Sequence, residues 1–482
     1  MSEPQAPATE SAAVAPASER VPLVDKILFS SGGGVQQFAS TAPHYLANPI
    51  FNLALGMDPV LIGIVLAIAR LWDAVTDPFV GNISDNTHTR WGRRRPYMVV
   101  GSIMMGLSFA AMWWLPRDAG QTFYFGYFLF TILAFYLGVT FFTVPWNALG
   151  IEMTSDYNER TSLFAWAGVT HKLVGFTTGW LYPLAQLAVF QNVLIGVRYV
   201  GCICGTLLIV LCIVPALRLK EPPRPVTLTR RKTEPFLKAM QVILSNRVLL
   251  VFSAASLLTM TSLTTVSSLG LYVNIYHIYH GDKLAAAVMM GWWGTIFNFL
   301  AMVSIPLVTW TTRRLGKHRT MMLGLGIAAL AEVSKYVLYT PALPVLQLSV
   351  ALLLAPGLSA YYILVSAMGA DIVDYDEWLS GRRREGLIAA ANMWITKMGI
   401  SLSFILAGVV LSVSGFDAEH ALQSASTVFW MRVNFCAIPA VGMAVALMLF
   451  WGYPLTRKRV EEIQAELPRR RELAAAAEQA AG

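Results

Sequence analysis

Residues 59–96 read PVLIGIVLAIARLWDAVTDPFVGNISDNTHTRWGRRRP, a long apolar stretch that carries a few charges and runs into an arginine-rich turn. A bilayer core of about 30 Å is crossed by roughly 20 helical residues, which the apolar part of this stretch supplies. Arginines that directly follow such a span are typical of the cytoplasmic side of a membrane. The stretch therefore predicts a transmembrane helix followed by a cytoplasmic turn.

The composition of the whole chain agrees with this prediction. Charged residues make up 13% of the 482 residues and apolar residues 56%, whereas soluble domains are about 25% charged. A soluble globule of this size needs more charge to cover its surface. The cysteines all lie in apolar stretches without metal-type spacing, which indicates packing residues. They are Cys202, Cys204, Cys212 and Cys436.

Apolar stretches of spanning length recur along the chain and predict an all-α integral membrane protein with twelve transmembrane helices. A charged, proline-rich segment at 218–246 separates six stretches from six, so we expect two six-helix halves at 26–217 and 247–455. We expect a disordered cytoplasmic tail at 1–25 and a basic cytoplasmic tail at 456–482. The predicted spans are 26–53, 58–82, 96–116, 121–151, 160–188, 193–217, 247–279, 284–311, 320–340, 342–370, 387–414 and 426–455.

The positions of the basic residues predict the orientation. With the N-terminus inside, the cytoplasmic segments hold 28 of the 36 lysines and arginines and the outer segments hold three. Such an asymmetry is a positive-inside signal, which places both termini in the cytoplasm and the chain in the cell (inner) membrane. It also explains the net charge of +8 without a nucleic-acid partner.

Three charges lie within the second span. Arg70, Asp73 and Asp77 are spaced by three and four residues, so they share one face of a helix. Each charge near the bilayer centre costs roughly 2.5–3.5 kcal/mol, so this face must look into the bundle or a wet cavity. One arginine does not neutralise two carboxylates, and the second needs a proton, a metal cation or a distant lysine. We favour a cation site over a purely structural ion pair of Arg70 with Asp73, because two carboxylates supply oxygen ligands for Na⁺ or share a proton.

Lys397 lies in the eleventh span and is a candidate for that distant lysine. It is about ten residues from the inner end of its span, roughly 15 Å along a helix. This depth is too great for comfortable snorkelling, and an unpaired lysine there would be costly. Pairing with Asp73 or Asp77 is therefore expected.

Polar residues also recur at helical spacing in the first and fourth spans, which indicates that these helices face a cavity or a polar partner. Glu332 and Lys335, by contrast, are expected to form a local ion pair three residues apart. The stripe of the first span is Gln37, Thr41, His44, Asn48 and Asn52, and that of the fourth is Thr140, Thr143 and Asn147.

Two motifs in the first half, RLWDAVTDP (70–78) and GNISDNTHTRWGRRRP (81–96), resemble the glycoside–pentoside–hexuronide:cation symporter family of the major facilitator superfamily. ADIVDYDEWLSGRRREG (370–386) is similar to that family's loop between its tenth and eleventh helices. The resemblance covers about 26–455. It implies the major facilitator fold and cation-coupled sugar transport.

Three groups of functional side chains are expected. The resemblance implies Arg70, Asp73, Asp77, Thr140, Tyr362, Asp371, Asp374, Arg383, Glu385 and Lys397, and the polar stripes and basic loops add the others. The cation-binding residues are Asp73, Asp77, Thr140 and Thr143. The substrate-binding residues are Gln37, Thr41, His44, Arg70, Asn147, Tyr362 and Lys397. The gating residues, expected to form ion pairs between the halves on the cytoplasmic side, are Arg93, Arg94, Arg95, Arg160, Asp371, Asp374, Arg383 and Glu385.

The chain departs from the family pattern at the sugar contacts. Gln37 and Thr143 stand where the family pattern has aspartates, Asn147 where it has a tryptophan, and Gly168 where it has an arginine. The cation carboxylates persist, so the departures imply retained coupling and a changed substrate. Neutral amide groups suit hydroxyls, whereas the lost charged contacts also leave room for an organic acid or an amphipathic solute such as a lysolipid.

These observations together predict a secondary active symporter that works by alternating access, with Na⁺ or H⁺ co-transported and no cofactor. The expected partners are a small-molecule solute and membrane lipids, and the chain is expected to act as a monomer. A channel would need a continuous polar pore, and a membrane enzyme would need a nucleophile–base set, a metal cluster or a Walker loop, none of which the sequence contains. A non-transporting sensor and either choice of cation remain open.

Overall fold

The computed structural model describes residues 20–87, 89–154, 156–219, 221, 246–381, 384–418, 420 and 422–481. Within these ranges the regular structure is helical and contains no strand. Residues 1–19 of the tail expected at 1–25 lie outside the described residues, as do most of the linker at 218–246 and Arg383. The end of the expected tail is wrong, because α1 already begins at Leu23.

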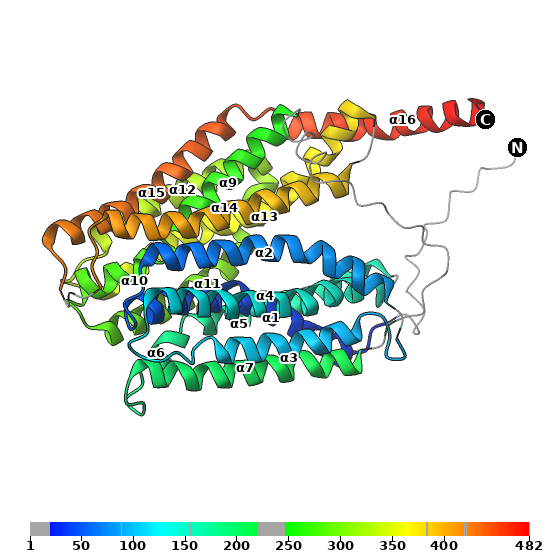
Figure 1. Cartoon of the computed structure of the whole chain (residues 1–482). Coiled ribbons are helices and arrows are strands. Elements are labelled where there is room, and N and C mark those ends of the chain that lie inside the picture. Colours follow the sequence, from blue (N-terminus) through cyan, green and yellow to red (C-terminus); the bar gives the residue numbers. More distant parts are fainter. Residues whose placement is uncertain are drawn as a thin grey trace, which may run out of the picture.

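Twelve long helices form the described part of the bundle, six before residue 219 and six after residue 246 (Figure 1). The first six are α1 (Leu23–Ala47), α2 (Pro59–Asn86), α3 (Arg95–Ala111), α4 (Gln121–Glu152), α5 (Tyr157–Thr178) and α7 (Val193–Arg218). The second six are α9 (Arg247–Ser267), α11 (Lys283–Leu315), α12 (Lys317–Leu338), α13 (Val350–Ser380), α14 (Glu385–Val413) and α15 (Ala425–Trp451). The prediction of twelve helices in two six-helix halves is therefore confirmed.

Short helical segments extend or join the long helices. They are η2 (Asn48–Asn52), α6 (Leu181–Ala185), α10 (Leu269–Val273), η3 (Asn274–Ile278) and η4 (Pro344–Ser349). A further helix, α16 (Arg457–Ala481), follows the last span. The predicted loop at 370–386 is shorter than expected, because α13 continues to Ser380.

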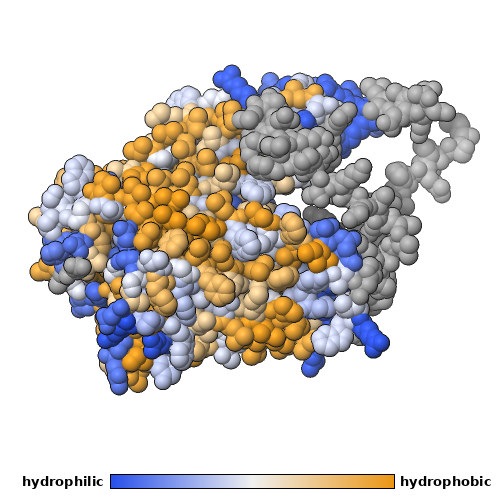
Figure 2. All heavy atoms as spheres, in the orientation of Figure 1, coloured by the Kyte–Doolittle hydropathy of each residue, from blue (hydrophilic) through white to orange (hydrophobic). Residues whose placement is uncertain are grey.

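By length and composition, nine helical segments in the described ranges are long and apolar enough to cross a membrane. The three long helices outside that set are α1, α3 and α5. Helix α3 has only 17 residues, α1 carries the polar stripe, and α5 contains the adjacent His171 and Lys172. Figure 2 shows apolar side chains covering much of the middle of the visible face, with hydrophilic residues toward the ends.

The two ends of the bundle differ in how the halves meet. We call the end that carries Arg20, Asn86 and Arg457 the terminal end, and the end that carries the turn at 53–58 the opposite end. At the opposite end, Tyr272 donates to Asn52 Oδ1 at 2.7 Å across the halves. In Figure 1, α14 diverges from α2 toward the terminal end. The two halves are therefore joined at the opposite end and diverge toward the terminal end.

Glycines allow α2 and α14 to approach closely. A Cβ added at Gly63 would lie 2.3 Å from the carbonyl oxygen of Phe404, and one at Gly408 would lie 2.4 Å from that of Pro59. One turn further along, the Ser401 hydroxyl donates to the Ala67 carbonyl at 2.9 Å. This backbone-to-backbone packing positions the polar face of α2 against α14.

Replacing Gly63 with alanine is expected to destabilise the protein by about 1–3 kcal/mol, because the new methyl group overlaps a backbone atom that has no rotamer to adopt. The measurement is the thermal unfolding midpoint of the purified protein. Gly126→Ala on α4 is the matched control, because its Cβ meets nothing within 4 Å. Equal midpoints for the two variants would contradict this account of the α2–α14 contact.

Helix α16 docks on the terminal end of α13. The guanidinium of Arg471 donates to both carboxylate oxygens of Glu377 at 2.7 and 2.8 Å. Trp378 donates its indole N–H to Glu466 at 2.7 Å, and Ile463 and Leu467 of α16 are buried. These contacts explain why α13 remains helical beyond the predicted membrane span.

Candidate functional site

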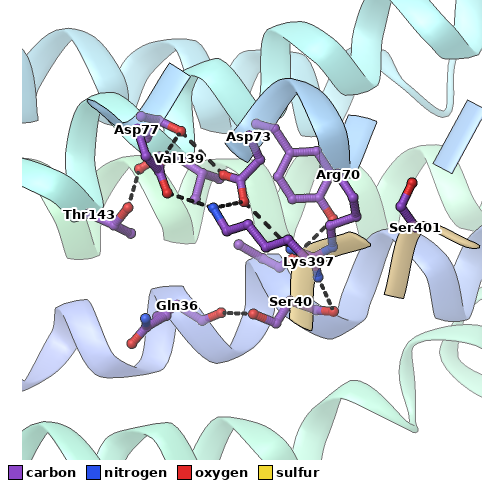
Figure 3. A network of polar contacts seen from close by, with 12 residues as sticks. Gln36, Ser40, Arg70, Asp73, Asp77, Val139, Thr143, Lys397 and Ser401 are labelled. Carbon is purple, nitrogen blue, oxygen red and sulfur yellow. Dashed lines mark hydrogen bonds and ion pairs between the residues drawn. The ribbon is translucent and has the colours of Figure 1, made fainter. Parts of the chain in front are cut away.

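A network of charged side chains lies where α2 meets α14 (Figure 3). Lys397 of α14 lies between two carboxylates of α2, with its Nζ 3.0 Å from Asp73 Oδ2 and 2.7 Å from Asp77 Oδ2. The three side chains are 13–29% exposed, so they are largely but not completely withdrawn from solvent. The expected pairing of Lys397 with these aspartates is confirmed, and it joins the two halves.

Thr140 of α4 contacts the other edge of the same carboxylates. Its hydroxyl lies 3.3 Å from Asp73 Oδ1 and 3.1 Å from Asp77 Oδ1, and 3.3 Å from the hydroxyl of Thr76. Thr140 is fully buried. Each of the two carboxylates therefore has one oxygen next to the Lys397 ammonium and the other next to the Thr140 hydroxyl.

Arg70 supplies the second positive charge. Its Nη1 is 4.0 Å from Asp73 Oδ2, and its Nη2 donates to the carbonyl of Ser40 at 3.3 Å. The guanidinium lies over the ring of Tyr136, 5.1 Å from the centroid. The contributions of Ser40 and Tyr136 were not evident from the sequence, since a backbone carbonyl and an apolar-span tyrosine carry no local signal.

The charges of this network balance. Arg70 and Lys397 contribute two positive charges, and Asp73 and Asp77 contribute two negative charges. The distant lysine therefore supplies the compensation that the sequence left open among a proton, a metal cation and a lysine. Any cation that bound these carboxylates would consequently have to share or replace the contacts of Lys397.

The second threonine of the fourth-span stripe has a different environment. The Thr143 hydroxyl donates to the Val139 carbonyl of its own helix at 2.9 Å, as Figure 3 also shows. The structure thus brings Thr140, but not the Thr143 hydroxyl, into the bonds around the carboxylates. Asn147, one turn further along α4, is half-buried.

Replacing Thr140 with valine is expected to weaken cation binding by about tenfold, because removing a buried hydroxyl partner of a charged group costs about 1–3 kcal/mol. Thr143→Val is the matched control and should change the affinity less than twofold, because its hydroxyl is bonded within α4. Titration of the cation into each purified variant measures the difference. The reverse order of effects would reassign the hydroxyl ligand to Thr143.

The substrate residues predicted on α1 lie beside the halves' interface. The Thr41 hydroxyl bonds the Gln37 carbonyl at 2.8 Å within the helix. The His44 ring lies 5.8 Å from the ring of Phe404 of the other half, and its buried Nδ1 makes no well-oriented hydrogen bond. His44 also lines a cavity between the halves with Asn48, and we call this space the inter-half cavity. His44 is therefore the predicted side chain with unused hydrogen-bonding capacity at this cavity.

Tyr362 lies in a different place from the carboxylates. It is 55% exposed and lines a cavity of the second half, to which Tyr45 of α1 also contributes. Neither Asp73 nor Asp77 is among the residues that line this cavity, and the role of Tyr362 in a sugar pocket stays a prediction.

The predicted gating residues bond within their own halves. Arg93 and Arg94 donate to Glu152 at 3.1 and 2.8 Å, and Arg94 also bonds Asp85 at 3.1 Å. The backbone N–H groups of Arg93, Arg94 and Arg95 all donate to Glu221 at 2.8–3.0 Å. The sequence analysis missed these three acidic partners, although their proximity to the ends of the predicted spans was a usable signal.

The other gating residues follow the same pattern. Arg160 donates to the Thr154 carbonyl at 2.9 Å, and Asp371 pairs with Lys317 at 2.7 Å. Asp374 accepts from Gln464 of α16 at 3.1 Å, and Glu385 begins α14. In this conformation Arg93, Arg94 and Asp371 find partners in their own halves, because the halves diverge at the terminal end. The expected ion pairs between the halves concern a conformation closed at that end, and they stay a prediction.

The chain is similar to known transporters over almost its whole length. Residues 28–457 match the family model described as MFS/sugar transport protein. The chain is 25% identical over 457 residues to YagG of Escherichia coli (strain K12), a candidate glycoside/cation symporter, covering 93% of this chain and 95% of that protein. It is also 22% identical over 488 residues to the sphingosine-1-phosphate transporter MFSD2B of Xenopus tropicalis, covering 93% and 91%.

The fold matches a solved transporter. The crystal structure of a bacterial homologue of the human lysosomal transporter Spinster, in an inward-facing and unoccupied conformation, has a TM-score of 0.67 to this structure. The match covers 89% of this chain and 95% of that chain at 15% identity, which compares the folds alone. The extent of the family match shows that this chain, a multi-pass membrane protein and not an enzyme, belongs to the MFS/sugar transport protein family of the major facilitator superfamily.

Proposed function

We propose that the protein is a secondary active symporter that couples a small solute of the sugar or glycoside class to Na⁺ or H⁺ by alternating access. The observation that carries this proposal is the bridge of Lys397 on α14 to Asp73 and Asp77 on α2, at 3.0 and 2.7 Å. Two carboxylates and a threonine hydroxyl form an oxygen-rich site of the kind that hard cations bind. The bridge also joins the two parts that must move in alternating access.

The electrostatics of the bridge suggest how the cation and the solute are coupled. A cation that binds Asp73 and Asp77 competes with Lys397 for their oxygens. The released ammonium is then unpaired in a poorly solvated place, which costs several kcal/mol. A solute hydroxyl between the halves can accept from Lys397 and offset this cost. Each ligand therefore favours the conformation that the other binds, which is the requirement for symport.

The inter-half cavity presents neutral hydrogen-bonding groups to a solute with hydroxyl groups, and its volume of about 40 Å³ requires that it widen to admit a sugar ring. His44, Asn48 and Thr178 line it together with Ser267 of the second half. These groups donate and accept hydrogen bonds without a net charge. The similarity to the candidate glycoside/cation symporter YagG supports the same substrate class.

We propose that the terminal end faces the cytoplasm of a cell with this protein in its inner membrane. The basic residues that favour the cytoplasmic side gather at this end, for example Arg93, Arg94 and Arg457. With the halves joined at the opposite end, the conformation would open toward the cytoplasm. All parts of the site come from one chain, so we expect a monomer to be the transporting unit.

The experiment is uptake into proteoliposomes that contain the purified protein, under an imposed Na⁺ gradient, an imposed H⁺ gradient or neither. The solutes are neutral glycosides, uronates and a lysophospholipid, the last because of the similarity to a sphingosine-1-phosphate transporter. We expect a neutral glycoside to accumulate under one of the two gradients only. Accumulation of the lysophospholipid alone, or uptake that ignores both gradients, would overturn the proposal.

A further inference from the structure

A second cavity, with a volume of about 200 Å³, is lined by residues of the half formed by 247–455 and by Tyr45 of the first half. We call it the aromatic cavity. Apolar side chains dominate its lining. Its aromatic walls are Tyr45, Trp293, Phe297, Tyr339, Tyr362 and Phe435. Large flat side chains around a space of this size favour an aromatic ligand, because rings gain from stacked and edge-to-face contacts beyond their buried area.

The aromatic cavity also contains an ion pair that the cation site does not use. Glu332 is 0% exposed and Lys335 is 4% exposed, and both line the cavity. Lys335 Nζ lies 2.6 Å from Glu332 Oε2 and 4.3 Å from the centroid of the Phe435 ring. Neither carboxylate oxygen has a well-oriented hydrogen bond despite this close contact. Glu332 therefore retains unused capacity to accept one.

A structural role alone explains this pair poorly. Ionisable residues at membrane depth are costly, and they usually mark a pathway or binding site. Two apolar residues of similar volume would pack the same helix at little or no cost in stability. The pair therefore indicates a polar group that visits the cavity.

The aromatic cavity adjoins the inter-half cavity. Tyr45, Ser267 and Met290 line both spaces. Tyr45 therefore stands between the two spaces, and a solute with its polar part near His44 would reach the aromatic cavity with an apolar part once the Tyr45 side chain turns aside. The two cavities together match a molecule with a hydroxylated part and a flat part.

We propose that the aromatic cavity binds the aglycone of the transported solute, a neutral aromatic ring that carries a hydroxyl group. The proposal rests on the glycoside transport proposed above and narrows its substrate class to aryl glycosides. A cavity of roughly 150 Å³ lined by apolar side chains holds a benzene molecule, so the space is adequate for one substituted ring.

The charge of the pair selects a neutral ligand. Glu332 and Lys335 sum to zero, so a carboxylate or an ammonium group would bring an uncompensated charge into an apolar space. A hydroxyl both donates and accepts, so it bonds Glu332 and Lys335 at once. A phenolic hydroxyl on the ring is neutral, and it both donates and accepts a hydrogen bond.

The test uses glucose, galactose and xylose. For each sugar, it compares the methyl, phenyl and 4-hydroxyphenyl β-glycosides. Binding to the purified full-length protein is measured by competition and by thermal shift. We expect the phenyl form to bind about tenfold more tightly than the methyl form, and the 4-hydroxyphenyl form about tenfold more tightly again. The first ratio, the affinity of the phenyl form over that of the methyl form, measures the contribution of the aromatic walls. The second ratio, the affinity of the 4-hydroxyphenyl form over that of the phenyl form, measures the contribution of the ion pair.

Two variants separate the contributions. Glu332→Gln combined with Lys335→Gln removes the pair without leaving a lone charge and should abolish the second ratio only. Trp293→Ala opens one wall and should abolish the first. Trp310→Ala is the matched control for the wall, because Trp310 of α11 is 58% exposed. Glu461→Gln combined with Arg457→Gln is the matched control for the ion pair, because the side chains of this pair are both 62% exposed. The controls should keep both ratios.

The outcomes separate this proposal from the proposed function. Equal affinities for the three forms of a bound sugar, or ratios that survive in the two variants, would overturn the aglycone site while leaving glycoside transport intact. Ratios that behave as expected without gradient-driven uptake would support the site and overturn the symport. No binding of any of these glycosides would overturn both.

Discussion

Replacing Asp77 with asparagine is expected to reduce gradient-driven uptake by about a hundredfold or more. The wild-type network is neutral, and the substitution leaves Arg70 and Lys397 against a single carboxylate. An added cation would then meet a net positive site. Removing one partner of a buried ion pair costs about 3–5 kcal/mol, and the 29% exposure of Asp77 places the effect toward the lower end. Each 1.4 kcal/mol corresponds to about tenfold.

The measurement is the initial rate of solute accumulation in proteoliposomes under the driving cation gradient. Asp282→Asn is the matched control, because it makes the same chemical change at an exposed helix cap. Asp282 caps α11 by accepting from the Ala285 N–H at 3.0 Å, and asparagine caps a helix about as well. Equal accumulation by Asp77→Asn and Asp282→Asn would mean that the driving cation binds elsewhere.

Replacing Lys397 with glutamine is expected to lower coupled uptake by about tenfold or more. The cause differs from that of Asp77→Asn, because the cation is held more tightly instead of less tightly. The two carboxylates keep Arg70 but lose the ammonium that competes with the cation, so the site becomes net negative. A cation held there without competition is released slowly, and the cycle stalls in the loaded state. The α2–α14 ion pairs are lost as well, which removes the link between cation binding and the contact of the halves.

Comparison of uptake with exchange identifies this cause. A stalled cycle reduces net accumulation more than it reduces exchange of labelled solute across the membrane, since exchange does not require release of the cation. Lys458→Gln on α16 is the control for the chemical change, because Lys458 is exposed. An equal loss of both activities in Lys397→Gln would point to a folding defect or to a direct role in holding solute.

Local spacing in the sequence was sufficient to predict the face of α2 that carries Arg70, Asp73 and Asp77. The spacing of three and four residues fixes a shared face once the segment is helical, and the cost of buried charge directs that face inward. The depth of Lys397 in its span likewise predicted a buried partner. The balance of charge was not predictable, because it depends on a contact between residues 320 positions apart in the chain.

The gating residues show why complementary charges alone do not predict pairs. Arg94 has several acidic candidates near the terminal end, and the structure pairs it with Glu152 and Asp85 of its own half. The acidic residue that lies nearest to Arg94 depends on how far the two halves diverge, and this distance changes with the conformation. The second cavity was missed for a related reason. Glu332 and Lys335 were correctly paired from their spacing, but only the packing of several helices shows that they line a cavity with Tyr362.

The central claim is that Lys397 and the transported cation are alternative partners of Asp73 and Asp77. The most direct test is titration of Na⁺, and separately of H⁺, into purified solute-free wild-type protein and Lys397→Gln. The account predicts that the variant binds the driving cation at least about tenfold more tightly than the wild type, because its competitor is gone. An equal or weaker affinity in the variant would contradict competition at this site.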